Sequence, residues 1–162
     1  MNGTTRTRST DRPRLDATDR KILGELTADG RISLAELGRR VNLSSPAVAE
    51  RVQRLERSGV ITGYRAEIDP RALGYELIAI VRVKPSPGQL ARIPELAAEI
   101  PEVGECHRIT GEDCFYLTVH LRSIDELSPL LDRFLVYGQT TTSLINATPI
   151  PRRDPPIDDA GE

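Results

Sequence analysis

The 162-residue sequence predicts an α+β protein with an N-terminal helix-turn-helix and a C-terminal ferredoxin-like βαββαβ domain. Three short amphipathic segments, each preceded by a cap residue, occupy the first third of the chain. Beyond residue 75 the apolar period changes to the alternation that is typical of strands. The sign of the net charge changes near the same point of the chain. Residues 1–65 hold 13 Lys and Arg against 8 Asp and Glu, and residues 66–162 hold 9 Lys and Arg against 16 Asp and Glu.

Composition argues against several classes of protein. No apolar run approaches the roughly 20 residues that span a membrane, and the N-terminus lacks the apolar core of a secretory signal. Two cysteines are too few for a disulfide framework, so we expect a cytoplasmic chain with reduced thiols. The sequence holds no Walker loop, dinucleotide-binding glycine pattern or nucleophile elbow, so we do not expect an enzyme.

The chain divides into five parts. They are a flexible basic arm (1–14), the helix-turn-helix (15–65), a linker strand and turn (66–75), the βαββαβ domain (76–150) and a flexible C-terminal tail (151–162). The arm holds four arginines and hardly an apolar side chain, so burial cannot repay the entropy of ordering it. On a bound duplex it would add phosphate or minor-groove contacts.

Caps and apolar spacing define the first two helices. Asp16 lies three residues before Asp19 and is placed to cap the first helix. Ser33 and Glu36 have the spacing of a capping box for a second helix, which runs to about Val41.

The third helix follows a tight turn, Asn-Leu-Ser. Ser45 is predicted to cap it, with Pro46 at the first helical position, and it ends at Ser58-Gly59. At about 100° per residue one side of this helix is apolar and the other is polar and mainly basic. The apolar side holds Val48, Val52 and Leu55, and the other side holds Ala47, Glu50, Arg51, Arg54 and Arg57.

A short turn followed by an arginine-bearing amphipathic helix is the pattern of a helix-turn-helix whose second helix enters the DNA major groove. A small residue near the helix start lets the backbone approach the bases, hydroxyls there suit a phosphate, and arginines reach guanines or phosphates. The predicted DNA-binding residues are Ser44, Ser45, Ala47, Glu50, Arg51 and Arg54. This requires the arginines to be presented outward, not held by acidic residues of the C-terminal half. The alternative is a three-helix scaffold with a solvated arginine face.

Residues 76–150 follow the order βαββαβ. The expected strands are 76–84, 103–110, 114–121 and 140–150, and the expected helices are 87–100 and 123–135. This is the order of a split βαβ fold, an antiparallel sheet with both helices on one face. In the first strand Ile78 and Ile80 are apolar on the face that the helices leave open. A second copy that packs sheet on sheet would cover them, so we predict a homodimer.

Four stretches, in this order and spacing, carry a resemblance to a known family. They are LDATDRKILGEL, DGRISLAELGRRVNLSSPAVAERVQRLERSGVITGYRAEIDPRALGY, IPEVGECHRITGEDCFYLTVHL and YGQTTTSLINATPIPRR. Over about residues 15–150 the chain resembles the Lrp/AsnC family (leucine-responsive or feast/famine regulators). The resemblance implies a winged helix-turn-helix with the third helix as recognition helix. It also implies a C-terminal RAM domain that forms dimers, often assembles further, and binds amino acids or related effectors between subunits.

The turn at 111–115 is the sensor turn that the resemblance implies. Many members have Gly-Asp-x-Asp-Tyr there, whereas this chain has Cys114 in place of the second acid. Amides at Gly111 would bind the effector's carboxylate, Glu112 or Asp113 its ammonium, and hydroxyls of the last strand would assist. The predicted effector-binding residues are Gly111, Glu112, Asp113, Cys114, Thr140 and Thr142. The alternative is a polar hairpin turn without a ligand.

No metal or other cofactor is expected. Cys106, His107, Cys114 and His120 are potential ligands, but no Cys-x-x-Cys pair exists and strand neighbours point to opposite faces. They are interpreted as two half-buried thiols and two ordinary histidines.

The expected function is therefore a sequence-specific transcriptional regulator modulated by an amino-acid or related effector. As a homodimer it would bind a near-palindromic duplex site, and it would not bind a membrane. The alternative is an architectural DNA-binding protein that wraps or bridges DNA without a ligand, and a third reading is a small enzyme on the ferredoxin-like half.

Overall fold

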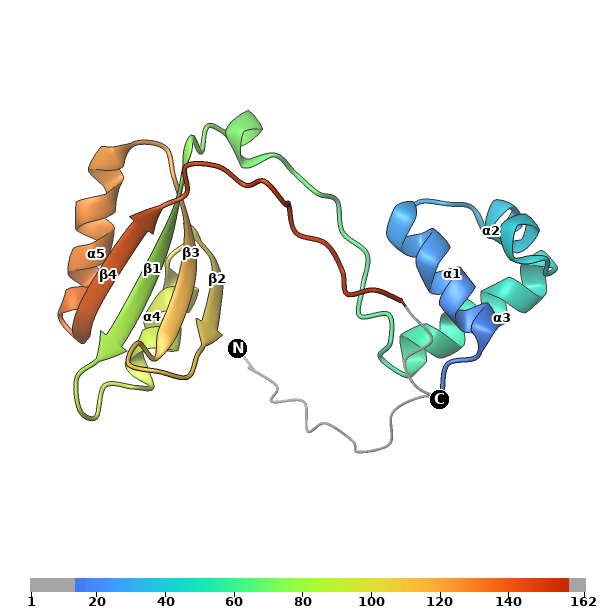
Figure 1. Ribbon diagram of the computed structural model, residues 1–162, viewed down its shortest axis with the longest axis horizontal. Helices are drawn as coiled ribbons and strands as arrows, with labels where there is room; N and C mark the ends of the chain where they lie inside the picture. The colour runs from blue at the N-terminus through green and yellow to red at the C-terminus, as the bar shows by residue number, and fades with distance from the viewer. Residues whose placement is uncertain (1–13, 158–162) are drawn as a thin grey trace. The chain divides into compact units, whose positions relative to one another are not determined.

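The computed structural model describes residues 14–157, which divide into two compact units (Figure 1). Within the described residues, one unit comprises 14–66 with 152–157, and the other comprises Glu67–Pro151. The predicted basic arm lies outside the described residues except for Arg14, as does the end of the predicted tail (158–162). No described helix is long and apolar enough to cross a membrane.

The N-terminal unit is built from the three predicted helices. Asp16 is the N-cap of the first, and the side chains of Asp16 and Asp19 each accept the other's backbone N–H in a capping box. Ser33 caps the second helix by accepting the N–H of Glu36 at 3.2 Å. The helices are α1 (Ala17–Ala28), α2 (Leu34–Val41) and α3 (Ser45–Arg57).

The cap of α3 differs from the prediction by one residue. Ser44, not Ser45, is the N-cap: its backbone is extended, and its hydroxyl accepts the N–H of Ala47. Pro46 then occupies the second helical position, where an N–H would have no partner within the helix. Sequence alone does not separate two adjacent serines, because either can supply the capping oxygen.

A glycine closes the turn between α2 and α3. Asn42 adopts the left-handed conformation (φ 56°), and the N–H of Leu43 donates to the carbonyl of Gly38 at 2.8 Å. A Cβ on Gly38 would lie only 2.7 Å from the carbonyl oxygen of Leu43. The helix-turn-helix therefore depends on the absence of a side chain at this position.

The apolar sides of the three helices meet in one small core. The predicted buried side of α3 is confirmed, since Val48, Val52 and Leu55 are all buried. The buried residues of this core are Ile22, Leu37, Val41, Val48, Val52 and Leu55.

The segment after α3 contains no strand. The predicted linker strand in 66–75 is wrong, and in the described residues no wing follows α3. A 3-10 turn, Pro70–Leu73, stands there instead, capped by the Asp69 side chain. The β-forming residues of this segment lie between left-handed glycines such as Gly59 and Gly74, and no neighbouring strand supplies ladder hydrogen bonds.

The C-terminal unit is the predicted antiparallel sheet with two helices on one face (Figure 1). Its strand order is β2-β3-β1-β4. Ala79, Val81 and Val83 of the central strand face the helices and are fully buried. The elements are β1 (Leu77–Pro85), α4 (Arg92–Glu99), β2 (Val103–Arg108), β3 (Phe115–Leu121), α5 (Leu127–Leu135) and β4 (Gly138–Leu144).

Element boundaries differ most from the prediction at α4, α5 and β4. Helix α4 begins at Arg92 instead of 87, because a turn around left-handed Gly88 precedes it. Helix α5 begins at Leu127 after a short 3-10 turn, which keeps Pro129 in the first helical turn. Strand β4 covers 138–144 instead of 140–150, since Ala79, near the start of β1, is the residue that pairs with Leu144.

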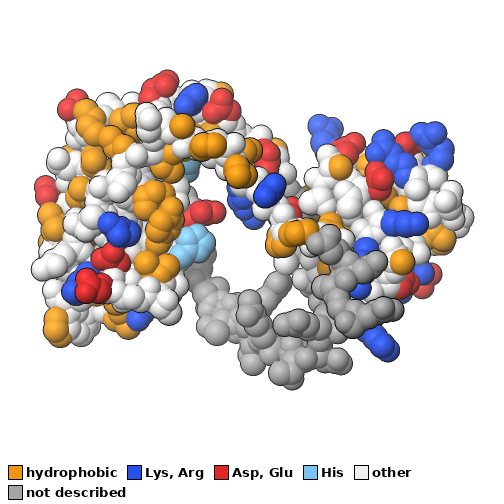
Figure 2. Space-filling view, in the orientation of Figure 1, with side chains coloured by type: hydrophobic (Ala, Val, Ile, Leu, Met, Phe, Trp, Pro, Cys, Tyr) orange, Lys and Arg blue, Asp and Glu red, His pale blue; other side chains and the backbone are white. Residues whose placement is uncertain are grey.

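The second face of the sheet combines apolar and polar side chains. Ile78 and Ile80 point to this face and are half-buried, opposite His120 and Thr118 of β3 in the register. Hydrophobic side chains also gather over the strands of this unit in the space-filling view (Figure 2). The described elements therefore leave an apolar strip on the sheet face away from α4 and α5.

We predict opposite effects for two helical glycine substitutions. Gly38→Ala places a Cβ against a backbone carbonyl and is expected to destabilise the N-terminal unit by about 1–3 kcal/mol. Gly24→Ala in α1 meets no atom within 4 Å and is expected to stabilise it by about 0.5–1 kcal/mol. Thermal melts followed by circular dichroism measure both effects. Equal stability of the two variants would contradict the close approach at Gly38.

Candidate functional site

Two arginines of α3 are bound by carboxylates of α1. Arg51 Nη1 donates to Asp16 Oδ2 at 2.7 Å and to Asp19 Oδ1 at 2.9 Å. Arg54 Nη2 donates to the two carboxylate oxygens of Asp19 at 2.6 and 2.9 Å. Asp19 is only 1% exposed, so a buried carboxylate joins two guanidinium groups and fixes α3 against α1.

The ion pairs shift the ionisation of their members. The hydrogen bond from Arg51 lowers the pKa of Asp16, with help from the backbone N–H of Asp19. The same contacts, first to Asp16 and then to Asp19, raise the pKa of Arg51. Both shifts favour the charged forms of Asp16 and Arg51.

These ion pairs bear on whether Arg51 and Arg54 can contact DNA as predicted. The acidic partners come from α1 of the same unit, not from the acidic C-terminal half of the chain. The side chain of Arg51 is 27% exposed and that of Arg54 is 53% exposed, so neither is fully turned inward. DNA contact by Arg51 and Arg54 stays a prediction, and the structure gives both residues a structural role that sequence reasoning missed.

The remaining predicted DNA-binding residues lie at the start and on the outer side of α3. The hydroxyl of Ser44 is used as the helix cap, Ser45 is exposed, and Ala47 is half-buried. Glu50 is exposed and forms no hydrogen bond or ion pair with another described residue. The start of the helix therefore presents small side chains and a hydroxyl.

Gln53 was missed from the sequence. It is exposed and, like Arg57, has no side-chain partner among residues 14–157. Its helical angle, about 140° from Val48, lies just outside the span of roughly 180° to 300° from which the residues of the polar side were taken. An uncharged side chain with both a donor and an acceptor was therefore left out.

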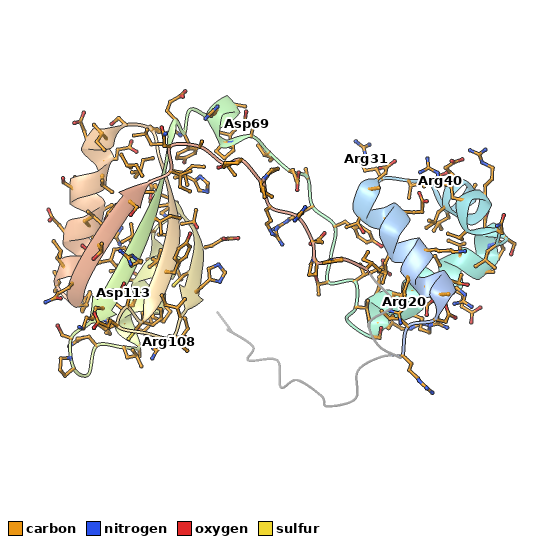
Figure 3. The ribbon with its side chains drawn as sticks, in the orientation of Figure 1. Arg20, Arg31, Arg40, Asp69, Arg108 and Asp113 are labelled. Carbon is orange, nitrogen blue, oxygen red and sulfur yellow. The ribbon has the colours of Figure 1, made fainter. Side chains whose placement is uncertain are left out.

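A third arginine ties α2 to α1. Arg40 Nη1 lies 2.8 Å from Glu25 Oε2, and its Nε lies 2.9 Å from Glu36 Oε1 (Arg40 is labelled in Figure 3). These two carboxylates raise the pKa of Arg40, Glu25 first. Part of the positive charge of the helical unit is therefore neutralised within the unit.

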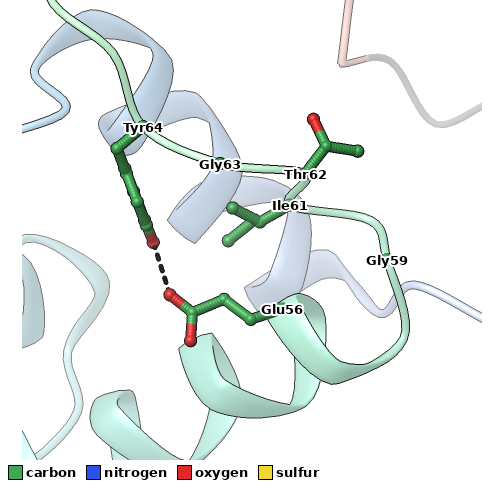
Figure 4. A pocket seen from close by; sticks show the side chains of 6 residues that line it. All are labelled: Glu56, Gly59, Ile61, Thr62, Gly63 and Tyr64. Carbon is green, nitrogen blue, oxygen red and sulfur yellow. Dashed lines mark hydrogen bonds between the residues drawn. The ribbon is translucent and has the colours of Figure 1, made fainter. Parts of the chain in front are cut away.

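A shallow hollow lies beside the C-terminal end of α3 (Figure 4). The hydroxyl of Tyr64 donates to Glu56 Oε1 across it at 3.0 Å. Burial, together with Glu56, raises the pKa of Tyr64, so the phenol stays protonated and keeps its donor. This contact fastens the segment after α3 to the helix.

The predicted sensor turn is fastened to the central strand. The N–H of Cys114 donates to the carbonyl of Val83, and Asp113 Oδ2 lies 3.3 Å from Arg82 Nη1. Figure 3 shows Asp113 near one end of the sheet. Gly111 has a φ of 114°, a conformation that suits glycine, and Glu112 is exposed.

Thr140 and Thr142 lie apart from the Arg82–Asp113 pair. They pair in register with Val83 and Val81, so they point to the face of the sheet that carries the helices. Arg82 points to the other face. The hydroxyl of Thr142 is buried without a hydrogen-bond partner in the described residues. Within one chain the six predicted effector residues therefore do not surround one cavity, and their role stays a prediction.

The four potential metal ligands are also separated. Cys106 is half-buried on the core, where burial raises the pKa of its thiol, while His107 is exposed. Cys114 is half-buried too, and the ring of His120 makes an edge contact with Tyr75. In the described range no group of three His, Cys, Asp or Glu side chains is arranged to hold a metal ion.

Family comparisons match both units. An AsnC-type helix-turn-helix domain matches residues 15–56, and an Lrp/AsnC ligand binding domain matches residues 78–155. The regulator LrpA of Mycobacterium tuberculosis is 43% identical over 129 residues, 79% of this chain and 86% of that protein. LrpC of Bacillus subtilis is 34% identical over 132 residues, 82% of this chain and 92% of that protein.

Solved structures agree with this assignment. The structure of B. subtilis LrpC has a TM-score of 0.81 at 32% identity and covers 86% of this chain and 99% of its own. A Neisseria meningitidis transcriptional regulator solved as its L-Met complex has a TM-score of 0.79 at 28% identity, covering 86% and 94%. These relatives are transcriptional regulators, which confirms the prediction that the chain is not an enzyme. The chain belongs to the Lrp/AsnC family of DNA-binding transcriptional regulators, with a helix-turn-helix domain and a ligand-binding domain.

Proposed function

We propose that this regulator acts in the cytoplasm as a homodimer that binds specific duplex sequences through α3, under the control of an amino-acid or related small effector. The proposal rests on the way in which α3 is held in the N-terminal unit with one side exposed. Its apolar side is buried, ion pairs hold it to α1, and its outer side is polar and exposed. A helix of 13 residues held in this way has the size and rigidity to enter a major groove.

Homodimerisation is supported by the second face of the sheet. No helix among residues 14–157 covers the apolar strip around Ile78 and Ile80. A second copy would cover the strip with the same surface, which is the arrangement that a two-fold axis produces. A two-fold dimer would prefer near-palindromic DNA with half-sites about one or more helical turns apart.

Effector binding is supported by the ligand-binding domain and by the chemistry at the turn. Arg82 and Asp113 offer one positive and one negative group 3.3 Å apart, which complements the carboxylate and ammonium of a zwitterion. The relative from N. meningitidis was solved with L-Met. An effector would reach this pair at the interface between subunits, since one chain alone does not enclose it.

An architectural protein that wraps or bridges DNA without an effector is the second candidate. It is favoured by the separation of Thr140 and Thr142 from the sensor turn, so that the predicted effector residues do not line one cavity among the described residues of a chain. The two functions differ in whether a small molecule changes DNA affinity.

We predict that Ile80→Glu converts a dimer into a monomer. A carboxylate in the centre of the apolar strip would be buried without a partner at the interface. The matched control is Val136→Glu, at the exposed C-terminal end of α5. Light scattering at micromolar concentration measures the molar mass, and circular dichroism confirms folding. A monomeric wild type, or a folded dimeric Ile80→Glu variant, would refute the proposed interface.

We predict that at least one amino acid raises the melting temperature and changes the affinity for the preferred DNA site. Because linkage is reciprocal, DNA must change the affinity for that amino acid by the same factor. Arg82→Ala is expected to abolish the response while leaving effector-free DNA binding intact. A thermal-shift panel of amino acids measures the change in melting temperature, and DNA titrations with and without the amino acid measure the change in DNA affinity. If no amino acid has an effect, the architectural function is favoured.

A further inference from the structure

We infer that base recognition by this chain is carried by Glu50 and Gln53, and that Arg51 and Arg54 are positioning residues for α3. The inference deepens the proposed function and rests on it, since it requires α3 to enter the major groove.

Both arginines already donate to carboxylates of α1. Guanine recognition uses two parallel donors of one guanidinium, which meet the O6 and N7 acceptors together. Arg51 already commits Nη1 to Asp16 and Asp19, and Arg54 commits Nη2 to Asp19. Each guanidinium is thereby anchored to α1 through one nitrogen, and moving it outward to a base would break its contact with Asp19. That carboxylate is 1% exposed and would lose a charged partner inside the unit.

Glu50 and Gln53 lie on the outer side of α3. They are three residues apart on α3, so their side chains are neighbours on one face. At about 200° and 140° from Val48, they lie on either side of the line opposite the buried face. Both are exposed and without a partner among the described residues, so neither gives up a protein contact to meet a base.

The side chains of Gln53 and Glu50 suit different bases. The amide of Gln53 offers a donor and an acceptor side by side, which matches the N7 and N6 of adenine in the major groove. The carboxylate of Glu50 only accepts, so it suits the N4 amino group of cytosine and is repelled by the acceptors of guanine. We therefore expect each half-site to contain an A·T pair read by Gln53 and a C·G pair read by Glu50.

Arg57 has a separate expected role. It lies on the same face but at the last residue of α3, and it has no partner in the described part of the chain. A free cation at the end of a groove-bound helix contacts phosphate, which adds affinity for any sequence. It therefore provides an internal comparison for the base-reading pair.

The test begins with selection of preferred sites from a random duplex library by the full-length wild type. Gln53→Ala is expected to lose the preference at one A·T position and to bind the selected site at least about 10-fold more weakly, with unchanged affinity for random duplex. Glu50→Ala is expected to relax the C·G position. The matched control is Gln89→Ala, the same substitution in the C-terminal unit, which is expected to bind as wild type.

The positioning role of Arg54 has its own readout. Arg54→Ala is expected to lower the melting temperature and the DNA affinity while the selected sequence stays the same. Arg54→Lys keeps a cation near Asp19 and is expected to recover part of both losses. Arg57→Ala is expected to weaken specific and random binding by the same factor, and to reduce the slope of log K against log salt by about 1.

The outcomes distinguish a failure of base reading by Glu50 and Gln53 from a failure of sequence-specific DNA binding as a whole. A wild type that selects no sequence overturns sequence-specific binding and the inference together. A wild type that selects a site, with Gln53→Ala and Glu50→Ala selecting the same site at the same affinity, overturns the inference alone. Loss of a G·C position in Arg54→Ala would make Arg54 a base reader and would also overturn it.

Discussion

A buried carboxylate is the constraint on which the helix-turn-helix depends. Asp19 lies inside the N-terminal unit and contacts guanidinium groups from two successive turns of α3. A buried charge without a partner is strongly unfavourable, so α3 is held at the place and rotation where both arginines reach it. Asp16 adds the cap of α1 and a further contact to Arg51. One carboxylate therefore sets which side of α3 faces outward.

The ion pairs to Asp19 reduce the positive charge that α3 can offer to DNA. An excess of arginine in a small unit suggests DNA contact, but two of the arginines on α3 and Arg40 on α2 have carboxylate partners within the unit. The charge that remains available to a duplex is smaller than the sequence count indicates. Specificity then depends more on polar side chains without partners, and general affinity depends more on unpaired cations.

The sequence predicted what local rules control and missed what tertiary contacts control. Helices with a single good cap, such as Asp16, and strands with clean alternation were placed correctly because those signals act over a few residues. The cap at Ser44 depends on a choice between two adjacent serines. The early end of β4 and the missing linker strand depend on whether a neighbouring strand is there to pair with. The Arg54–Asp19 pair joins residues 35 positions apart, which no local pattern reports. The opposite orientation of Thr142 and Arg82 likewise follows from strand register, which the quoted motifs do not contain.

The central claim is that Asp19 and Arg54 stabilise one another in the absence of DNA. A double-mutant cycle with Asp19→Asn and Arg54→Met, measured by the free energy of unfolding of the full chain, tests it directly. The account predicts a favourable coupling energy of at least about 1 kcal/mol, because the hydrogen bonds join charged groups and one of them is buried. A coupling energy within about 0.3 kcal/mol of zero would contradict it and would leave Arg54 free to contact DNA.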